Sequence, residues 1–162
     1  MKKFIPDDLP LGLAAPKKKG AKVRVRNVGP NAPEHNIQVG VAGFLSEALD
    51  GQPGVIWFAV PNGGARPGVT VMKNGIERRF SAEGRKLREE GVKGGVSDII
   101  ICWKSRMICI EMKRKGGYQS TDQKDFEHDA ILAGAVYTVC RSVREVENFL
   151  DTLGIEMAAT TY

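Results

Sequence analysis

A chain of 162 residues, with 42% hydrophobic and 27% charged residues, has the size and composition of one globular domain with a hydrophobic core. Its apolar runs fall short of the roughly 20 residues of a membrane-spanning helix, and the start MKKFIPDDLP lacks the apolar stretch of a signal peptide, so we expect no membrane contact and a cytoplasmic location. The formal net charge of +5 gives modest support for a polyanionic partner.

The first 32 residues are rich in proline and in basic side chains, a composition that disfavours packing into a core. Lys17 to Lys19 form a basic run, and Val23 to Val28 alternates apolar and basic residues, as an edge strand does. We expect residues 1–32 to form a basic arm that is either mobile or in contact with a second subunit. The arm serves either non-specific contact with phosphates or solubility alone.

A helix is predicted over residues 33–49, because apolar side chains recur there with helical spacing along one stripe. Glu34 lies near this stripe at the start of the helix, whereas Glu47 is turned away from it. Glu34 is therefore a candidate for an acid that reaches a site at the end of a sheet. Alternatively, it only stabilises the N-terminus of the helix through the helix dipole. The next predicted element is a buried strand over residues 55–60.

Turn and hairpin signals fill the segment that follows this strand. Glycines around Arg66 permit close approach of the backbone, so Arg66 either meets a phosphate or belongs to a tight turn. An Asn-Gly pair predicts a hairpin over residues 69–80. Ser81 then caps a short charged helix, whose Arg85 and Lys86 belong to a basic face. That face is either solvated surface or a contact with phosphate groups.

The central feature of the sequence is an apolar ribbon over residues 99–112, two runs rich in β-branched residues joined at Lys104 and Ser105. This pattern predicts a β-hairpin. A two-residue turn places Asp98 directly opposite Glu111, with their Cβ atoms about 4.5–5.5 Å apart on one face of the sheet. One residue more or fewer in the turn would move Asp98 to the other face.

Lys113 follows Glu111 by two residues, so its side chain is expected on the same face. Two adjacent carboxylates stay ionised at neutral pH when a cation lies between them, and Mg²⁺ is a hard ion suited to carboxylate and phosphate oxygens. Lys113 would then face the attacking water or the phosphate. Alternatively, Lys113 and Glu111 form a structural ion pair, and Asp98 only begins a strand.

A basic loop that contains two glycines follows the ribbon, and its Arg114 and Lys115 are candidates for contact with phosphates. Ser120 and Gln123 then form a capping-box pattern that opens a helix. Gln123 is either only the partner of Ser120 in the box or also a polar group that orients water or phosphate near Lys113. Spacing alone does not separate these two roles.

The remaining elements are the helix over residues 121–133, a strand over 135–140 and a capped helix over 142–153, followed by a tail over 155–162. The three cysteines fall in strand-like apolar runs, so we expect buried, reduced thiols. Both faces of the central hairpin are apolar away from its acidic end, which indicates helices on both sides. The sequence therefore predicts an α/β fold, an α/β/α sandwich with a central mixed β-sheet.

An acid on a first helix, an aspartate that opens a strand, and Glu-x-Lys on the paired strand together resemble the PD-(D/E)xK nuclease superfamily. More narrowly, the segments PNGGAR, GVKGGVSD and IEMK, followed by a helix with an early glutamine and by a strand, resemble the virus-type replication-repair nuclease (VRR-NUC) domain. The resemblance covers most of residues 33–150, and it implies a nuclease domain over 33–154 with a restriction-endonuclease-like core. The sequence departs from the family at Ser97, where a proline usually precedes the aspartate.

The resemblance implies that Asp98 and Glu111 bind Mg²⁺ or Mn²⁺, that Glu34 completes the acidic set, that Lys113 assists the attacking water and that Gln123 supports it. It further implies a homodimeric endonuclease that acts on branched DNA such as Holliday junctions, in a bacterial or phage-infected cell. Two alternatives stay open at this point. One is a general or restriction-type nuclease that cuts linear duplex, and the other is a catalytically inert DNA-binding accessory protein.

Overall fold

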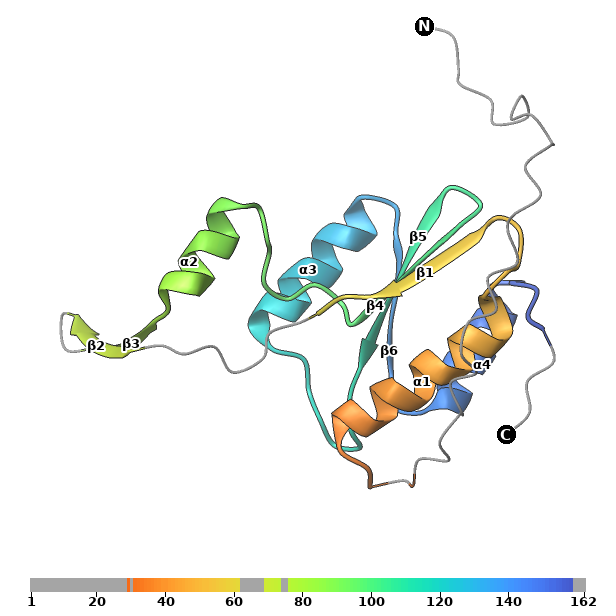
Figure 1. The fold of residues 1–162 in the computed structure, drawn as a ribbon, viewed down its shortest axis with the longest axis horizontal. Helices are drawn as coiled ribbons and strands as arrows, with labels where there is room; N and C mark the ends of the chain where they lie inside the picture. Colours follow the sequence, from red (N-terminus) through yellow and green to blue (C-terminus); the bar gives the residue numbers. More distant parts are fainter. Residues whose placement is uncertain (1–28, 30, 62–68, 74–75, 159–162) are drawn as a thin grey trace, which may run out of the picture.

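The computed structural model describes residues 29, 31–61, 69–73 and 76–158 (Figure 1). Their elements in chain order are the helix α1 (Glu34–Leu49), the strands β1 (Val55–Ala59), β2 (Val69–Lys73) and β3 (Ile76–Phe80), the helix α2 (Ala82–Glu89), the strands β4 (Ile99–Trp103) and β5 (Arg106–Met112), the helix α3 (Thr121–Leu132), the strand β6 (Val136–Cys140) and the helix α4 (Val143–Thr152). Each predicted helix and strand within the described residues is present, with ends that differ by a few residues. The predicted arm over 1–32 lies almost entirely outside the described residues.

Four strands form the main sheet, in the order β1-β4-β5-β6. The pairs β1–β4 and β4–β5 are antiparallel, and β6 runs parallel to β5. The sheet is therefore mixed, as the sequence predicts. A parallel neighbour needs a crossover connection, and α3 supplies it between β5 and β6.

Helices cover both faces of this sheet. Figure 1 shows α3 on one side of the strands and α1 with α4 on the other, and the two hydrophobic clusters agree with that arrangement. The larger cluster joins α1 and α4 to alternate residues of the central strands, among them Ile99, Ile101 and Ile110. The smaller cluster contains Ile100 and Cys109 on the opposite face, below α3. The predicted α/β/α arrangement with a mixed sheet is thus confirmed.

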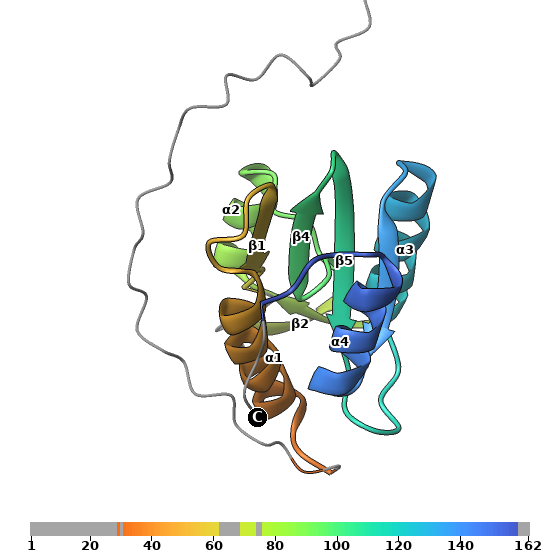
Figure 2. The ribbon, with the colours of Figure 1, turned by 90° about the vertical axis from the view of Figure 1, so that its right-hand side faces the viewer.

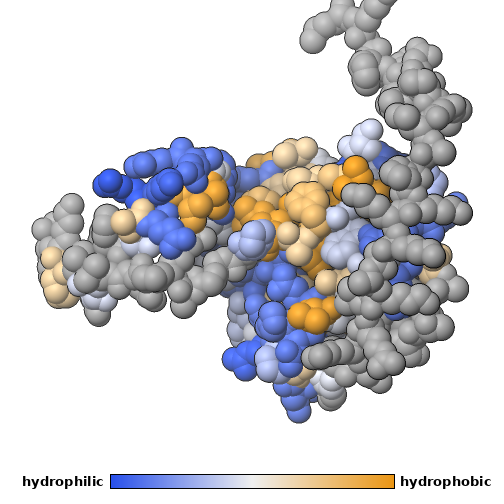
Figure 3. Space-filling model, in the orientation of Figure 1, coloured by the Kyte–Doolittle hydropathy of each residue, from blue (hydrophilic) through white to orange (hydrophobic). Residues whose placement is uncertain are grey.

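The strand β1 differs from the prediction of a fully buried strand. It is the edge strand of the main sheet, and the side chains of Ile56 and Phe58 are 67% and 48% exposed. Figure 3 shows hydrophobic side chains gathered on this face of the molecule, over β1. The expectation of buried cysteines also fails at Cys102, which pairs with Ile56 and is exposed, whereas Cys109 and Cys140 are buried thiols.

The strands β2 and β3 and the helix α2 form an insertion between β1 and β4, with a two-stranded sheet of its own. The side chain of Ser81 accepts a hydrogen bond from the backbone N–H of Gly84, which confirms the predicted cap. Where the insertion leaves the body, the backbone N–H of Val60 donates to the carbonyl of Asp98 at 2.8 Å. Figure 1 shows the insertion extending away from the main sheet.

The chain beyond α4 returns to the core. Ile155 is buried in the larger hydrophobic cluster, and the backbone N–H of Ala158 donates to the carbonyl of Ala48 at 2.9 Å. Among the described helices, none combines the length and the apolar character needed to cross a membrane.

Candidate active site

Five predicted side chains meet at one end of the main sheet. Asp98 directly precedes β4, Glu111 and Lys113 lie at the end of β5, Gln123 is in the first turn of α3, and Glu34 is the first residue of α1. Figures 1 and 2 show that the start of α1 and the connection from β5 to α3 lie at the same end of the molecule. Two helix starts and two strand ends therefore converge here.

The register of the central hairpin is the predicted one. Trp103 pairs with Arg106 and Ile99 pairs with Ile110, so one further step along the ribbon sets Asp98 against Glu111. The turn residues Lys104 and Ser105 have φ values of 46° and 60°, the left-handed conformation of a two-residue hairpin turn. A turn of this kind closes the hairpin without a bulge, which keeps both acids on one face.

Asp98 fastens the two strands together at this end. Its Oδ2 atom accepts a hydrogen bond of 2.8 Å from the backbone N–H of Met112. The side chain is only 9% exposed, and Ser97 before it is buried, with its hydroxyl donating to the carbonyl of Ile99 at 3.4 Å. Ser97 occupies the position where the family resemblance expects proline, and the turn forms with serine in that place.

Glu111 is fully buried, and one of its two oxygens makes all of its hydrogen bonds. The Oε1 atom accepts a hydrogen bond of 2.6 Å from Nζ of Lys113 and a second, short one from Nε2 of Gln123. The Oε2 atom is buried and has no hydrogen-bond partner among the described residues. A buried carboxylate oxygen without a partner is costly, so a bound ligand or a proton is expected at this atom.

The electrostatics of the cluster follow from this burial. Burial raises the pKa of Glu111 from 4.5 to about 7, a shift that the hydrogen bond from Lys113 reduces and the charge of Asp98 increases. Burial by itself lowers the pKa of Lys113, but its hydrogen bond to Glu111 and the charges of Glu111 and Glu34 outweigh that effect, so the net direction is upward. Lys113 therefore stays protonated at neutral pH, next to an acid that titrates there.

Glu34 enters the cluster through Lys113. Its Oε1 atom lies 3.3 Å from Nζ of Lys113, and its side chain is 43% exposed. The backbone of Lys113 is held as well, since its N–H donates to the carbonyl of Cys140 at 2.9 Å. The lysine thus bridges two carboxylates, and the choice of Glu34 over Glu47 as the helix-borne acid agrees with this contact.

Gln123 completes the predicted capping box and also contacts Glu111 of the cluster. Its Oε1 atom accepts a hydrogen bond of 2.9 Å from the backbone N–H of Ser120, and the hydroxyl of Ser120 accepts one from the backbone N–H of Gln123. The capping box is therefore complete. The other end of the same amide donates to Glu111.

The predicted basic residues are less closely tied to the cluster. Arg114 and Lys115 are exposed directly after Lys113. Arg85 and Lys86 are exposed on α2, each in an ion pair with the glutamate four residues later, at 3.4 Å and 3.8 Å. Arg66 lies outside the described residues.

Sequence reasoning missed the polar group formed by Gln119 and Tyr137 beside the cluster. Gln119 donates to Glu127 at 2.8 Å and to the hydroxyl of Tyr137 at 3.4 Å. Burial raises the pKa of Tyr137 above its ordinary value, and the charge of Glu111 adds to the shift. Tyr137 pairs with Cys109 and so shares the face of Glu111. Only the parallel pairing of β6 with β5 reveals this relationship.

The acids of the cluster offer part of a site for a divalent metal ion. Within the part of the chain that the structure describes, no group of three or more His, Cys, Asp or Glu side chains is arranged to hold a metal. Oε2 of Glu111 is buried without a hydrogen-bond partner there, and Asp98 lies opposite Glu111, one step beyond the pair of Ile99 and Ile110. Asp98 and Glu111 are therefore the residues that could hold a hard cation, whose coordination water and phosphate oxygens would complete.

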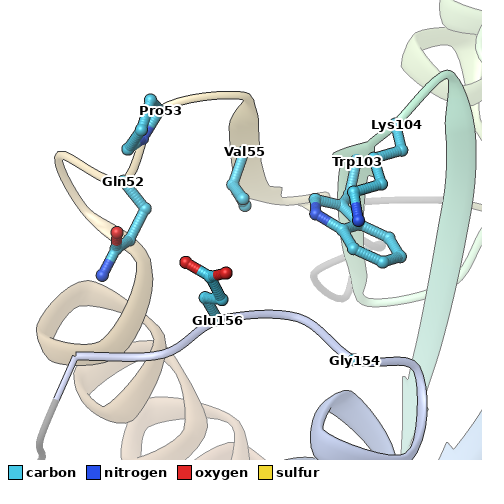
Figure 4. Close-up of a pocket in the computed structure, with 7 residues that line it drawn as sticks. All are labelled: Gln52, Pro53, Val55, Trp103, Lys104, Gly154 and Glu156. Carbon is cyan, nitrogen blue, oxygen red and sulfur yellow. The ribbon is translucent and has the colours of Figure 1, made fainter.

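A separate hollow of about 200 Å³ lies at the opposite end of the sheet (Figure 4). Trp103 and Lys104 line it from the central hairpin, and Glu156 reaches into it from the segment after α4. None of the predicted site residues lines this hollow.

Comparison with protein-family models, with curated proteins and with solved structures gave no significant match for the chain.

Proposed function

We propose that this protein is a Mg²⁺- or Mn²⁺-dependent endonuclease that hydrolyses phosphodiester bonds of DNA, built on a PD-(D/E)xK core of the VRR-NUC type. The observation that carries the proposal is the state of Glu111. Its carboxylate is buried at the end of a sheet, one oxygen is shared by Lys113 and Gln123, and the other has no described partner. An ion pair built only for stability would leave no such buried oxygen unsatisfied.

The order of the elements supports the same proposal. The main sheet and the helices that cover it follow one another in the chain as α1, β1, the hairpin of β4 and β5, α3, β6 and α4. Along this order the chain carries an acid on the first helix, an aspartate before a strand and Glu-x-Lys on the next strand, the arrangement that the family resemblance rests on. The restriction-endonuclease-like assignment of the core remains part of this proposal.

Asp98 and Glu111 would hold the ion in the proposed enzyme. When bound, a divalent ion supplies Lewis-acid polarisation of the phosphate and lowers the pKa of a bound water. The protein side chains hold the reacting groups in position. Asp98 keeps the ends of the two central strands together through Met112, so its own carboxylate and that of Glu111 stay in fixed positions. Such preorganisation avoids reorganisation of the site during the reaction.

Lys113 is proposed as the positive charge that faces the phosphate. Its contacts with two carboxylates, at 2.6 Å and 3.3 Å, favour the ammonium form, which stabilises negative charge as it develops on the phosphate oxygens. Glu34 orients the lysine from the helix side. Gln123 fixes the rotamer of Glu111 by donating to Oε1, which leaves Oε2 as the oxygen directed to the ion.

The proposed substrate is branched DNA such as a four-way junction, and the proposed enzyme is a homodimer in a bacterial or phage-infected cell. This part of the proposal rests on the family resemblance, with the net charge of +5 and the exposed Arg114 and Lys115 beside the site as physical support. A two-fold symmetric junction suits a two-fold symmetric enzyme.

The test is cleavage of a labelled four-way junction and of a matched linear duplex with Mg²⁺, with Mn²⁺ and with chelator. We expect cleavage only with metal and faster on the junction. Glu111→Gln and Asp98→Asn should abolish cleavage while binding to DNA in chelator is retained. The same variants should also lose the rise in melting temperature that Mn²⁺ gives the unaltered protein, a readout that does not depend on activity.

The outcomes separate the competing functions. Equal cleavage of duplex and junction would favour a general or restriction-type nuclease. Binding of DNA without cleavage under all conditions would favour an inert accessory protein and contradict the proposed enzyme. Full cleavage activity in Glu111→Gln would contradict the proposed active site.

A further inference from the structure

The loop between β5 and α3 connects two residues of the candidate site. It begins after Lys113, ends at Ser120 just before Gln123, and lies at the site end of the molecule (Figure 2). Its sequence, RKGGYQ, contains two basic residues and one aromatic residue. Any nucleic acid whose phosphate reaches Lys113 passes close to this loop.

The loop is held in place at several points. The backbone N–H of Gly117 donates to the carbonyl of Arg114 at 2.9 Å, which closes a turn, and the guanidinium of Arg141 donates to the carbonyl of Gly117 at 3.4 Å. On the far side, Gln119 is anchored to α3 and β6 by its hydrogen bonds to Glu127 and Tyr137. Tyr118 therefore lies between two fixed residues.

The side chain of Tyr118 is 87% exposed, although a tyrosine ring is among the largest apolar surfaces a residue offers. It makes no hydrogen bond and no ring contact with any other described residue. Arg114 and Lys115 are exposed in the same loop. An unburied aromatic ring on an anchored loop that also carries two cations is a combination that binds single-stranded nucleic acid by stacking and by phosphate contact.

We infer that Tyr118 stacks on a base whose face is free at a discontinuity of the DNA and so determines specificity for branched substrates. This inference rests on the proposed nuclease function. In a continuous duplex each base is stacked on both sides and offers no free face, whereas a fork or junction offers one at the branch point. The two cations hold the adjacent phosphates of either substrate equally. The ring therefore distinguishes substrates that the charges do not.

The test measures dissociation constants by fluorescence anisotropy in chelator, with a forked DNA and a continuous duplex of equal length. Stacking on aromatic residues is worth about 1–3 kcal/mol per base, so Tyr118→Ala should weaken fork binding by roughly fivefold or more relative to duplex binding. Tyr118→Phe keeps the ring and should match the unaltered protein. Lys115→Ala is the control, and it should weaken both DNAs by the same factor and reduce the salt dependence.

A forked DNA with an abasic site at the branch point completes a double-mutant cycle between Tyr118 and the stacked base. Where the stacked base is removed from the fork, Tyr118→Ala should cause no further loss. Equal weakening of fork and duplex by Tyr118→Ala, or an undiminished loss with the abasic fork, would overturn the inference. Because binding is measured without metal, this result is independent of cleavage. If the protein cleaves DNA but Tyr118→Ala does not weaken fork binding more than duplex binding, only the stacking role is refuted. If the protein does not cleave DNA, the proposed function is refuted.

Discussion

The ammonium nitrogen of Lys113 lies 3.3 Å from Oε1 of Glu34, although 79 positions separate the two residues in the chain. The contact joins the start of α1 to the end of β5, and the same nitrogen lies 2.6 Å from Glu111. A single lysine thus contacts two acids that belong to different layers of the fold, Glu34 from the helix layer and Glu111 from the sheet.

Replacing Lys113 by methionine should remove the charge while filling much of the same volume. Loss of one preorganised group that stabilises developing charge costs roughly 10²–10³ in rate, and we expect that loss in kcat. Lys115→Met is the matched control, because Lys115 is exposed two residues away; it should change DNA affinity and leave kcat nearly unaltered. Single-turnover cleavage of a junction measures both. A Lys113→Met variant with more than a tenth of the original rate would contradict the assigned role.

Glu34→Gln should have a smaller effect than the lysine replacement. The pair is partly exposed on the glutamate side, where ion pairs contribute about 0.2–1 kcal/mol, so we expect the rate to fall by no more than about fivefold. Glu47→Gln on the same helix serves as the control and should be silent. If Glu34→Gln instead raises the Mn²⁺ concentration needed for activity by a large factor, then Glu34 is a metal ligand rather than a partner of Lys113.

Gln123 allows its two roles to be separated by two substitutions. Gln123→Glu keeps an oxygen for the capping box but directs a carboxylate at Glu111, so activity should fall while the stability of the protein is retained. Gln123→Ala removes both contacts and should also cost roughly 0.3–1.5 kcal/mol in the free energy of unfolding. Urea denaturation and cleavage assays are compared for the two variants. Equal activity in Gln123→Glu and the unaltered protein would show that the contact with Glu111 is dispensable.

The raised pKa of Glu111 predicts how stability depends on pH in the metal-free protein. Between pH 4.5 and about 7 the folded state binds more protons than the unfolded state, because the folded pKa is the higher one. The stability contributed by protonated Glu111 is therefore complete below pH 4.5 and is lost as the pH rises through 7, by about 3 kcal/mol. The difference in unfolding free energy between the protein and Glu111→Gln, measured in chelator at pH 4.5 and pH 8, should change by this amount. A difference in unfolding free energy that does not vary with pH would refute the raised pKa of Glu111.

The hairpin turn offers a prediction about stability alone. Ser105 has a φ of 60°, a conformation that costs a residue with a side chain about 1 kcal/mol. Ser105→Gly should therefore raise the melting temperature without affecting cleavage, whereas Ser105→Ala should not raise it. Thermal unfolding followed by circular dichroism is sufficient. A lower melting temperature for Ser105→Gly would show that the turn is not strained.

The geometry of the hairpin was predictable because it is local. A two-residue turn and a side-chain period of two are enough to pair Asp98 with Glu111 and to place Lys113 beside them, and the observed register agrees. The capping box at Ser120 and Gln123 was predictable for the same reason, since its signal spans four residues. Sequence patterns of this kind specify contacts between near neighbours.

The features that sequence reasoning missed depend on the order of strands in space. The segment around Ile56 and Phe58 reads as a buried strand because it is apolar on both sides. In the fold only the face with Val55 and Trp57 packs on the larger cluster, and the face with Ile56 and Phe58 is exposed at the edge of the sheet. The position of Tyr137 next to Glu111 likewise follows from a parallel pairing with no local signal. The distance between Glu34 and Lys113 required knowledge of how α1 packs on the sheet.

The hydrogen bond between Val60 and Asp98 ties the outgoing end of the insertion to the body. On the returning side, Gly95 lies so close to the backbone of Asp122 and Gln123 that a side chain at this position would collide with the start of α3. Both ends of the insertion therefore join the body beside residues of the candidate site, and a displacement of the inserted hairpin and helix reaches the starts of β4 and α3 first.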